Sequence, residues 1–264
     1  MDSLLFYRRG GLGDTLLTFP VLEVLYSLNY EITTIGNCDY FEIAKLVGWV
    51  KECFYDFYEK IKARDFKKRI VFSINEIPPF PKTRQWIVDY YFDILNLPKK
   101  FSLVLPFSNS LKNNPLKDKA VLHPGSGSLK KVPPVELFLK IEGFLKSLGL
   151  KVCYLIGEAD EWIKDFAQNY WESVDVVEIA SALREARLFV GVDSGISHLA
   201  CYLGVKSFVF FGPTDSVVWK PLGSNYELIS TNEPCSPCFP KVCKTKECLS
   251  PERLFSLFLK KFKM

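Results

Sequence analysis

The residues best suited to hold a phosphate follow a short apolar run at 186–192, which is typical of a buried parallel strand. Asp193, Ser194 and Gly195 come next, and a helical pattern of apolar residues begins after them. The first amides of such a helix have no intrahelical partner, and Gly195 has no side chain to block a ligand. We therefore predict a phosphate-binding loop with His198 on its helix. In the alternative interpretation, Asp193 or Ser194 is only an N-cap and His198 a surface residue.

A second loop with the composition of a phosphate site covers residues 124–131. It follows a predicted strand at 120–123 and contains Gly125, Ser126 and Lys130. Glycine, serine and lysine between a strand and a helix are suited to a diphosphate, because α/β sheets bind ligands at the carboxyl ends of their strands. A flexible surface loop is the alternative.

Two carboxylates occupy similar positions after strands. Glu161 follows a predicted strand at 152–156, where it can accept hydrogen bonds from ribose hydroxyls or cap the next helix. Asp14 follows a predicted strand at 3–7 and the glycine-rich loop 8–13. A carboxylate would repel a phosphate, so Asp14 is either a helix cap or a proton acceptor. The loop lacks the third glycine of a dinucleotide fingerprint and the lysine of a P-loop.

The composition is that of a soluble globular protein. The chain has 264 residues, of which 48% are hydrophobic and 24% charged, and its net charge is +4. It has no apolar run long enough to span a membrane and no signal-peptide pattern at its start, so a cytoplasmic protein is expected. The mild positive charge suits an acidic ligand or an anionic lipid surface, and no nucleic-acid partner is expected.

The order of predicted elements repeats in the two halves of the chain. The first half contains expected strands at 3–7, 31–35, 50–57 and 69–74, and expected helices after Asp14, at 41–47 and at 86–95. Prolines, asparagines and lysines replace the periodic pattern between Pro98 and Asp118, so the domain linker is placed there. The second half has expected strands at 120–123, 152–156, 186–192 and 206–211, and expected helices at 135–148 and 251–262. This order predicts two Rossmann-like α/β domains in tandem.

Four motifs in this order resemble the bacterial lipopolysaccharide heptosyltransferases of glycosyltransferase family 9. They are Gly11-x-Gly13-Asp14-x-Leu16-Leu17-x-x-Pro20, His123-Pro124-Gly125, Asp193-Ser194-Gly195-x-Ser197-His198-Leu199-Ala200 and Phe211-Gly212-Pro213-Thr214-Asp215. The resemblance implies a GT-B architecture, in which two Rossmann-like domains face each other across a cleft. It also implies inverting transfer of a heptose from ADP-heptose to a lipid A–Kdo or inner-core acceptor. Such an acceptor would bring the protein to the inner face of the inner membrane as a peripheral protein.

The resemblance also implies roles for individual residues and domains. Residues 1–117 would be a short acceptor domain, 118–249 the donor domain, and 250–264 a helix that crosses back to the first domain. Asp14 takes the place of the catalytic base, and no metal is obligatory. Lys130 is expected to bind the donor and to stabilise the leaving group. The other expected donor-binding residues are Gly13, Gly125, Ser126, Glu161, Asp193, Ser194, Gly195 and His198. The chain has Lys130-Lys131-Val132-Pro133 where the family usually has Lys-x-Trp-Pro.

The eight cysteines fall into two groups. Cys38, Cys53, Cys153 and Cys201 lie in apolar contexts and are expected to be small buried hydrophobes. Cys235, Cys238, Cys243 and Cys248 lie within fourteen positions. They can hold a structural zinc or an iron–sulfur cluster, pair as disulfides or remain thiols.

Two other functions compete with glycosyl transfer. A non-catalytic relative that binds a nucleotide sugar or a lipid would fit the short first half, but Asp14 argues against it. A dehydrogenase would need the three-glycine fingerprint and an acidic residue at the end of the second strand, whereas Glu31 begins that strand.

Overall fold

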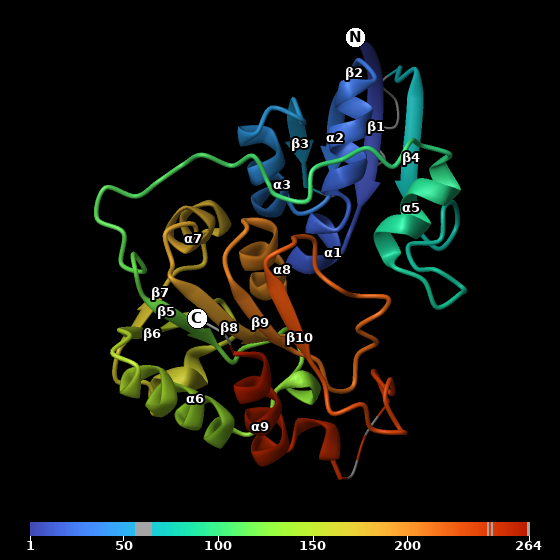
Figure 1. Ribbon diagram of the computed structural model, residues 1–264. Coiled ribbons are helices and arrows are strands. Elements are labelled where there is room, and N and C mark those ends of the chain that lie inside the picture. Colours follow the sequence, from blue (N-terminus) through green and yellow to red (C-terminus); the bar gives the residue numbers. More distant parts are fainter. Residues whose placement is uncertain (56–64, 242, 244, 263–264) are drawn as a thin grey trace. The chain divides into compact units, whose positions relative to one another are not determined.

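The computed structural model describes residues 1–55, 65–241, 243 and 245–262. The chain divides into two compact units, Met1–Phe107 (unit 1) and Ser108–Met264 (unit 2). Each unit contains a parallel β-sheet with helices packed against it (Figure 1). The expected fold class, two Rossmann-like α/β units, is therefore confirmed. Within the described ranges, no helix is both long enough and apolar enough to cross a membrane.

Unit 1 has a four-stranded sheet in the order β3-β2-β1-β4. The edge strand β3 is only partly buried, whereas Leu4, Leu5 and Phe6 at the centre of β1 are all buried. Its strands are β1 (Asp2–Arg8), β2 (Tyr30–Ile35), β3 (Glu52–Phe54) and β4 (Lys68–Phe72). Its helices are α1 (Leu12–Leu16), α2 (Phe19–Ser27), α3 (Cys38–Leu46) and α5 (Ile87–Leu95). Residues 56 and 57 of the expected third strand lie outside the described residues.

The first helix of unit 1 is broken in two. The sequence pattern indicates one helix after Asp14, but α1 ends at Leu16 and α2 begins at Phe19. Pro20 lies in the first turn of α2, where its missing N–H costs no hydrogen bond. The break limits α1 to five residues, and Asp14 lies in its first turn because α1 begins at Leu12.

A disulfide joins Cys38, the first residue of α3, to Cys53 in β3. Their Cα atoms lie 5.5 Å apart, which is the usual separation for a disulfide. The expectation that both residues are unpaired buried hydrophobes is therefore wrong. Both residues are only partly buried, and polar residues such as Asn37, Asp39 and Glu52 flank them in the sequence. The sequence contains no signal for the distance between the two cysteines.

Unit 2 has a six-stranded sheet in the order β10-β9-β8-β5-β6-β7. Helices α6 and α9 cover one face of this sheet, and α7 and α8 cover the other (Figure 1). The strands are β5 (Ala120–His123), β6 (Val152–Ile156), β7 (Tyr170–Glu172), β8 (Leu188–Val192), β9 (Ser207–Phe210) and β10 (Tyr226–Ile229). The helices are α6 (Val135–Ser147), α7 (Val176–Leu183), α8 (Gly195–Tyr202) and α9 (Pro251–Lys261), and short 3₁₀ turns form at η1 (Leu129–Lys131), η2 (Glu161–Asp165) and η3 (Glu247–Leu249).

The boundary between the units lies at Phe107/Ser108, earlier than the expected boundary at 117/118. The segment between these points is tied to unit 2. The Asn114 side chain donates to the carbonyl of Ala182 at 3.0 Å, and Arg184 donates to the carbonyl of Asn109 at 2.9 Å. Leu116 is fully buried. The loss of the periodic apolar pattern between Pro98 and Asp118 therefore indicated the region of the boundary. The position of the boundary within that region depends on these long-range contacts.

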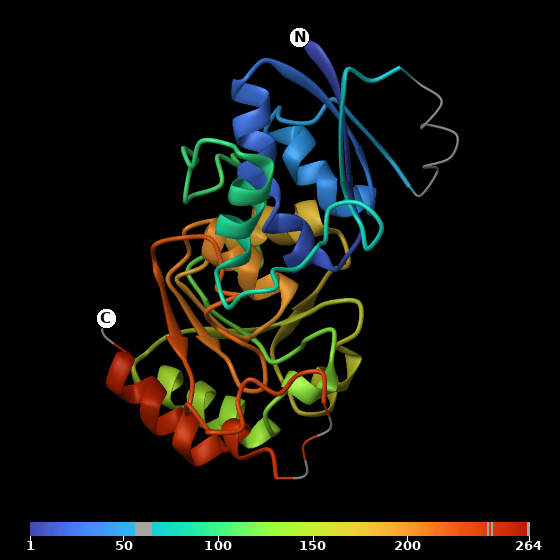
Figure 2. The ribbon, with the colours of Figure 1, turned by 90° about the vertical axis from the view of Figure 1, so that its right-hand side faces the viewer.

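Helix α9 belongs to unit 2, which corrects the expectation that it crosses back to the first domain. Figures 1 and 2 both show it beside α6. Leu254 and Phe258 lie in the core of unit 2, and the Phe258 ring lies 5.2 Å from that of Phe208 in β9. The apolar side of this amphipathic helix is therefore already buried within its own unit.

Candidate functional site

Two loops of unit 2 meet where the strand order of its sheet reverses. The chain runs from β5 outward through β6 and β7, and then returns to β8 on the other side of β5. In open α/β sheets, ligands bind outside the carboxyl ends of the strands at such a switch point. The loops after β5 and β8 are the two that the sequence predicts to bind phosphate.

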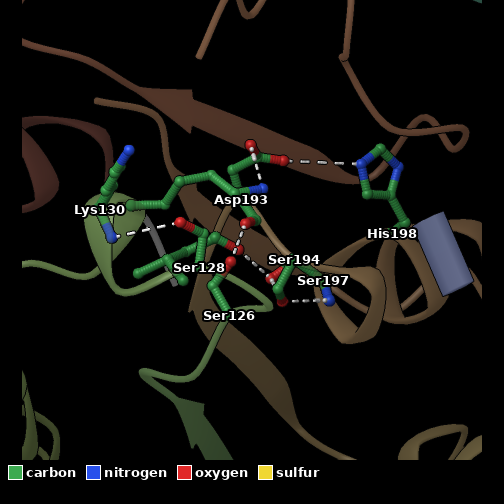
Figure 3. A network of polar contacts seen from close by, with 9 residues as sticks. Ser126, Ser128, Lys130, Asp193, Ser194, Ser197 and His198 are labelled. Atoms are coloured by element: carbon green, nitrogen blue, oxygen red, sulfur yellow. Dashed lines mark hydrogen bonds and ion pairs between the residues drawn. The ribbon is translucent and has the colours of Figure 1, made fainter. Parts of the chain in front are cut away.

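The loop after β5 is joined directly to the loop after β8. The buried hydroxyl of Ser126 donates to the backbone carbonyl of Asp193 at 2.9 Å (Figure 3). Gly125 precedes it, and a Cβ there would lie 2.0 Å from Oδ1 of Asp160, so a larger residue would have to displace that buried carboxylate. The contact between Ser126 and Asp193 brings the two predicted phosphate-binding loops together at one edge of the sheet.

Asp193 is a buried carboxylate with cationic and imidazole neighbours. Nζ of Lys131 lies 3.1 Å from its Oδ2, and Nε2 of His198 lies 3.8 Å from its Oδ1. Burial raises the pKa of Asp193, but His198, Lys131 and Thr214 outweigh that effect and lower it to about 2. Asp193 is therefore ionised at neutral pH, and its carboxylate holds the ammonium group of Lys131 beside the loop that follows β8. Nδ1 of His198 is buried and has no hydrogen-bond partner among the described residues.

Ser194 is the N-cap of α8, as the simpler interpretation predicts, but that interpretation is wrong about His198, which is buried and not a surface residue. The Ser194 hydroxyl accepts from the amide of Ser197 at 3.3 Å and lies 3.2 Å from the Ser197 hydroxyl (Figure 3). Gly195 is the first residue of the helix and is only partly buried. Capping by Ser194 and ligand binding by the remaining first-turn amides are compatible, since a cap satisfies only part of the helix terminus.

The structure brings Lys131, rather than Lys130, to Asp193. Lys130 is exposed, and its Nζ donates to the carbonyl of Pro240 at 2.8 Å. Figure 3 shows its side chain directed away from Asp193. The family motif drew attention to Lys130, so Lys131 was missed, although it stands next in the sequence.

Glu161 and Asp160 differ sharply in burial. Glu161, the predicted ribose contact, is exposed at the start of η2, on the loop after β6. Asp160 is 6% exposed and lies 3.7 Å from Nε2 of His123, which is also buried. Burial lowers the pKa of His123, so its ring is neutral at neutral pH. The sequence contains several acidic residues after β6, but it did not indicate that the carboxylate of Asp160 packs directly against Gly125.

The four clustered cysteines lie on the segment that packs beside the β5 loop. The amides of Cys238 and Phe239 donate to the carbonyl of Pro213, and Nζ of Lys131 lies 5.5 Å from the centre of the Phe239 ring. Burial and the neighbouring thiols raise the pKa of Cys248 to about 11, whereas hydrogen bonds from Lys246 and Thr245 lower the pKa of Cys243. Among the described residues, no group of three or more His, Cys, Asp or Glu side chains is arranged to hold a metal. In the structure, Cys235, Cys238, Cys243 and Cys248 are free thiols.

In unit 1, Asp14 is held on both carboxylate oxygens. Nη2 of the buried Arg8 lies 2.8 Å from Oδ1, and the amide of Gly11 donates to Oδ2 at 3.0 Å. The second contact is half of a capping box, so Asp14 does act as a cap. Its side chain is still 29% exposed, which leaves the carboxylate within reach of a ligand.

The glycines around Asp14 have different roles. A Cβ on Gly10 would lie 2.6 Å from the Cβ of Asp14, so glycine is required there. Gly13, a predicted donor residue, is the second residue of α1 in unit 1, whereas the other predicted donor residues belong to unit 2. Sequence reasoning missed Arg8 and Gly10 as the residues that position Asp14.

Residues 92–249 match the family model described as "Glycosyltransferase family 9 (heptosyltransferase)". Lipopolysaccharide heptosyltransferase 1 of Pseudomonas aeruginosa is 34% identical over 79 residues, which cover 30% of this chain and 22% of that protein. Lipooligosaccharide heptosyltransferase 2 of Campylobacter jejuni is 25% identical over 240 residues, which cover 89% of this chain and 61% of that protein. The chain therefore spans about three fifths or less of the length of these curated relatives.

Several solved structures share the fold at low sequence identity. The family 9 glycosyltransferase of Veillonella parvula has a TM-score of 0.77 at 15% identity and covers 98% of this chain and 96% of its own. ADP-heptose lipopolysaccharide heptosyltransferase II of Escherichia coli has a TM-score of 0.74 at 12% identity, with 98% of each chain covered. The dodecameric iron-containing heptosyltransferase TibC of enterotoxigenic E. coli, solved with ADP-D-beta-D-heptose, has a TM-score of 0.74 at 16% identity and covers 98% of this chain and 76% of its own.

Proposed function

The chain belongs to glycosyltransferase family 9, and on that premise we propose that it transfers a heptose from ADP-heptose to a lipopolysaccharide inner-core acceptor. The proposed reaction inverts the anomeric centre and uses Asp14 as its general base. The acceptor would be of the lipid A–Kdo type, so the reaction would take place at the inner face of the inner membrane, with the protein a cytoplasmic peripheral partner of that surface.

The contact between Ser126 and Asp193 carries the donor half of this proposal. It joins the two glycine-containing loops at the switch point of unit 2, where α/β sheets bind nucleotides. Similar proteins have been solved with ADP and with ADP-D-beta-D-heptose, which supports an adenine nucleotide as the ligand here. In this proposal Gly125, Ser126 and the first amides of α8 bind the diphosphate, and Glu161 binds the ribose.

The leaving group requires positive charge. As the bond between the anomeric carbon and the diphosphate oxygen breaks, negative charge grows on ADP. Lys130 would meet that charge if its side chain turned from the carbonyl of Pro240 toward the diphosphate. Lys131 lies beside the same loop, where Asp193 holds it. Lysines and helix amides together supply the stabilisation, so the proposed reaction requires no metal cofactor.

Asp14 would accept the proton of the acceptor hydroxyl as that oxygen attacks the anomeric carbon. The new bond forms on the face opposite the departing ADP, which inverts the configuration. Arg8 and the amide of Gly11 fix the carboxylate, so it is oriented before the acceptor arrives. The proton ends on Asp14, and ADP leaves with the bonding electrons.

A second candidate function is binding of a nucleotide sugar or lipid without catalysis. The observation that favours it is the occupation of both oxygens of Asp14, because a carboxylate that only caps a helix would have these same partners. Such a protein would bind ADP-heptose and would release no ADP in the presence of an acceptor.

Nucleotide-dependent thermal shifts followed by a transfer assay test the proposal. ADP should raise the melting temperature more than UDP or GDP, and Lys130→Ala should reduce that shift. Lys140→Ala is the matched control, since Lys140 is an exposed lysine of α6 paired with Glu252. Incubation with ADP-heptose and heptose-deficient rough-core lipopolysaccharide should add one heptose, detected by mass spectrometry. Equal protection by all three nucleotides and no heptose transfer would contradict the proposal.

A further inference from the structure

The sheet of unit 1 also has a switch point, and Asp14 lies at it. The chain runs from β1 outward through β2 and β3, and then returns to β4 on the other side of β1. Asp14 follows β1, and the segment 73–82 follows β4. A ligand that binds outside these two strand ends would therefore contact both.

The segment 73–82 is held in place by the two tyrosines of α5. The hydroxyl of Tyr90 donates to the carbonyl of Pro78 at 2.7 Å, and that of Tyr91 donates to the carbonyl of Pro79 at 3.3 Å. Tyr91 is fully buried, which raises the pKa of its hydroxyl and keeps it a donor. A loop that contains three prolines and is anchored in this way presents its side chains at fixed positions.

Arg8 connects this segment to the carboxylate. The guanidinium carbon of Arg8 lies 5.5 Å from the centre of the Phe80 ring, while its Nη2 lies 2.8 Å from Asp14. Arg8 is 3% exposed, whereas Phe80 is 50% exposed. An exposed aromatic ring therefore stands one guanidinium group away from the candidate base, on a rigid loop.

We infer that Phe80 is the platform on which the acceptor's sugar ring packs when its hydroxyl faces Asp14. A pyranose ring has apolar C–H surfaces between its hydroxyl groups, and an aromatic ring offers both apolar area and a negative face to such C–H groups. Arg8 is the positioning residue that fixes ring and carboxylate relative to each other. The inference rests on the proposed function and adds to it a residue that selects a saccharide acceptor.

A simpler role for Phe80 makes a different prediction. If the ring only shields the ion pair of Arg8 and Asp14 from water, its removal changes kcat and leaves the KM for the acceptor unchanged. If the ring binds the acceptor, Phe80→Ala raises that KM by about tenfold and leaves the KM for ADP-heptose unchanged. Phe80→Tyr retains the aromatic face and keeps the acceptor KM near that of the wild type, whereas Phe80→Leu does not.

The experiment uses ADP-heptose and deacylated heptose-deficient core oligosaccharide as probes. Steady-state kinetics give both KM values, and calorimetric titration of the oligosaccharide gives its affinity without the donor. Tyr26→Ala is the control, because Tyr26 is also an exposed aromatic residue but lies near the far end of α2. We expect weaker oligosaccharide binding for Phe80→Ala and unchanged binding for Tyr26→Ala.

The outcomes separate the inference from the proposed function. If the wild-type protein transfers heptose and Phe80→Ala has an unchanged KM for the acceptor, the inference is overturned and the proposed function stands. A lower kcat with both KM values unchanged also overturns it, in favour of shielding. A wild-type protein that neither binds the oligosaccharide nor transfers heptose overturns the inference and the proposed function together.

Discussion

Replacing Asp193 by asparagine tests whether its charge holds the donor loop of unit 2 together. The pKa of this buried carboxyl is lowered from 3.8 to about 2, because His198, Lys131 and Thr214 outweigh the effect of burial. A shift of that size corresponds to about 2 kcal/mol of folding free energy. The stabilisation is fully present above the unfolded-state pKa near 4, and it is lost as the pH falls through about 4 to 2. Asparagine has nearly the same shape but no charge.

We therefore expect Asp193→Asn to be about 2 kcal/mol less stable than the wild type at neutral pH, with the difference shrinking toward zero as the pH approaches 2. Urea unfolding, followed by circular dichroism at a series of pH values, measures that difference directly. Glu158→Gln is the control, since Glu158 is an exposed carboxylate in the same unit. A difference that stays constant from neutral to acidic pH would refute the reasoning, because it would reflect packing and not ionisation.

Two further predictions concern cysteines. Cys38→Ser and Cys53→Ser should each lower the free energy of unfolding of unit 1 by about 3 kcal/mol, and the double variant should lose no more, because both remove one disulfide; unchanged urea midpoints would contradict this. Cys243 should be alkylated by iodoacetamide at neutral pH faster than Cys248, since the lowered pKa of Cys243 gives more thiolate whereas burial raises that of Cys248 to about 11. Peptide mapping measures both rates, and faster labelling of Cys248 would show that the segment is arranged differently.

Hydrophobic patterning predicted most of the fold because it reports directly on burial. The apolar runs at 120–123 and 186–192 correspond to β5 and β8, which are buried throughout. The glycine and serine residues after them gave the positions of both loops. Patterning could not give the destination of α9, because an amphipathic helix shows that one face is buried but not which surface covers it.

The residues that sequence reasoning missed are those whose roles depend on direction or on distant contacts. Lys130 and Lys131 lie in the same 3₁₀ turn, where three residues complete a turn and neighbouring side chains therefore diverge. One reaches Pro240 and the other Asp193. Likewise, nothing in the composition of the first loop indicates that Arg8 is buried against Asp14, because that depends on how β1 ends in the sheet.

The transfer rate of Asp14→Asn tests the central claim most directly. General-base catalysis typically contributes ~10²–10⁴-fold, so heptose transfer should fall by at least about a hundredfold. Asparagine also weakens the pairing with Arg8, so the melting temperature is measured in parallel. The ADP-induced thermal shift should stay near that of the wild type, because the predicted diphosphate and ribose contacts belong to unit 2. A folded Asp14→Asn variant that binds ADP and transfers heptose at nearly the wild-type rate would contradict the account, since Asp14 would then be a helix cap and not the base.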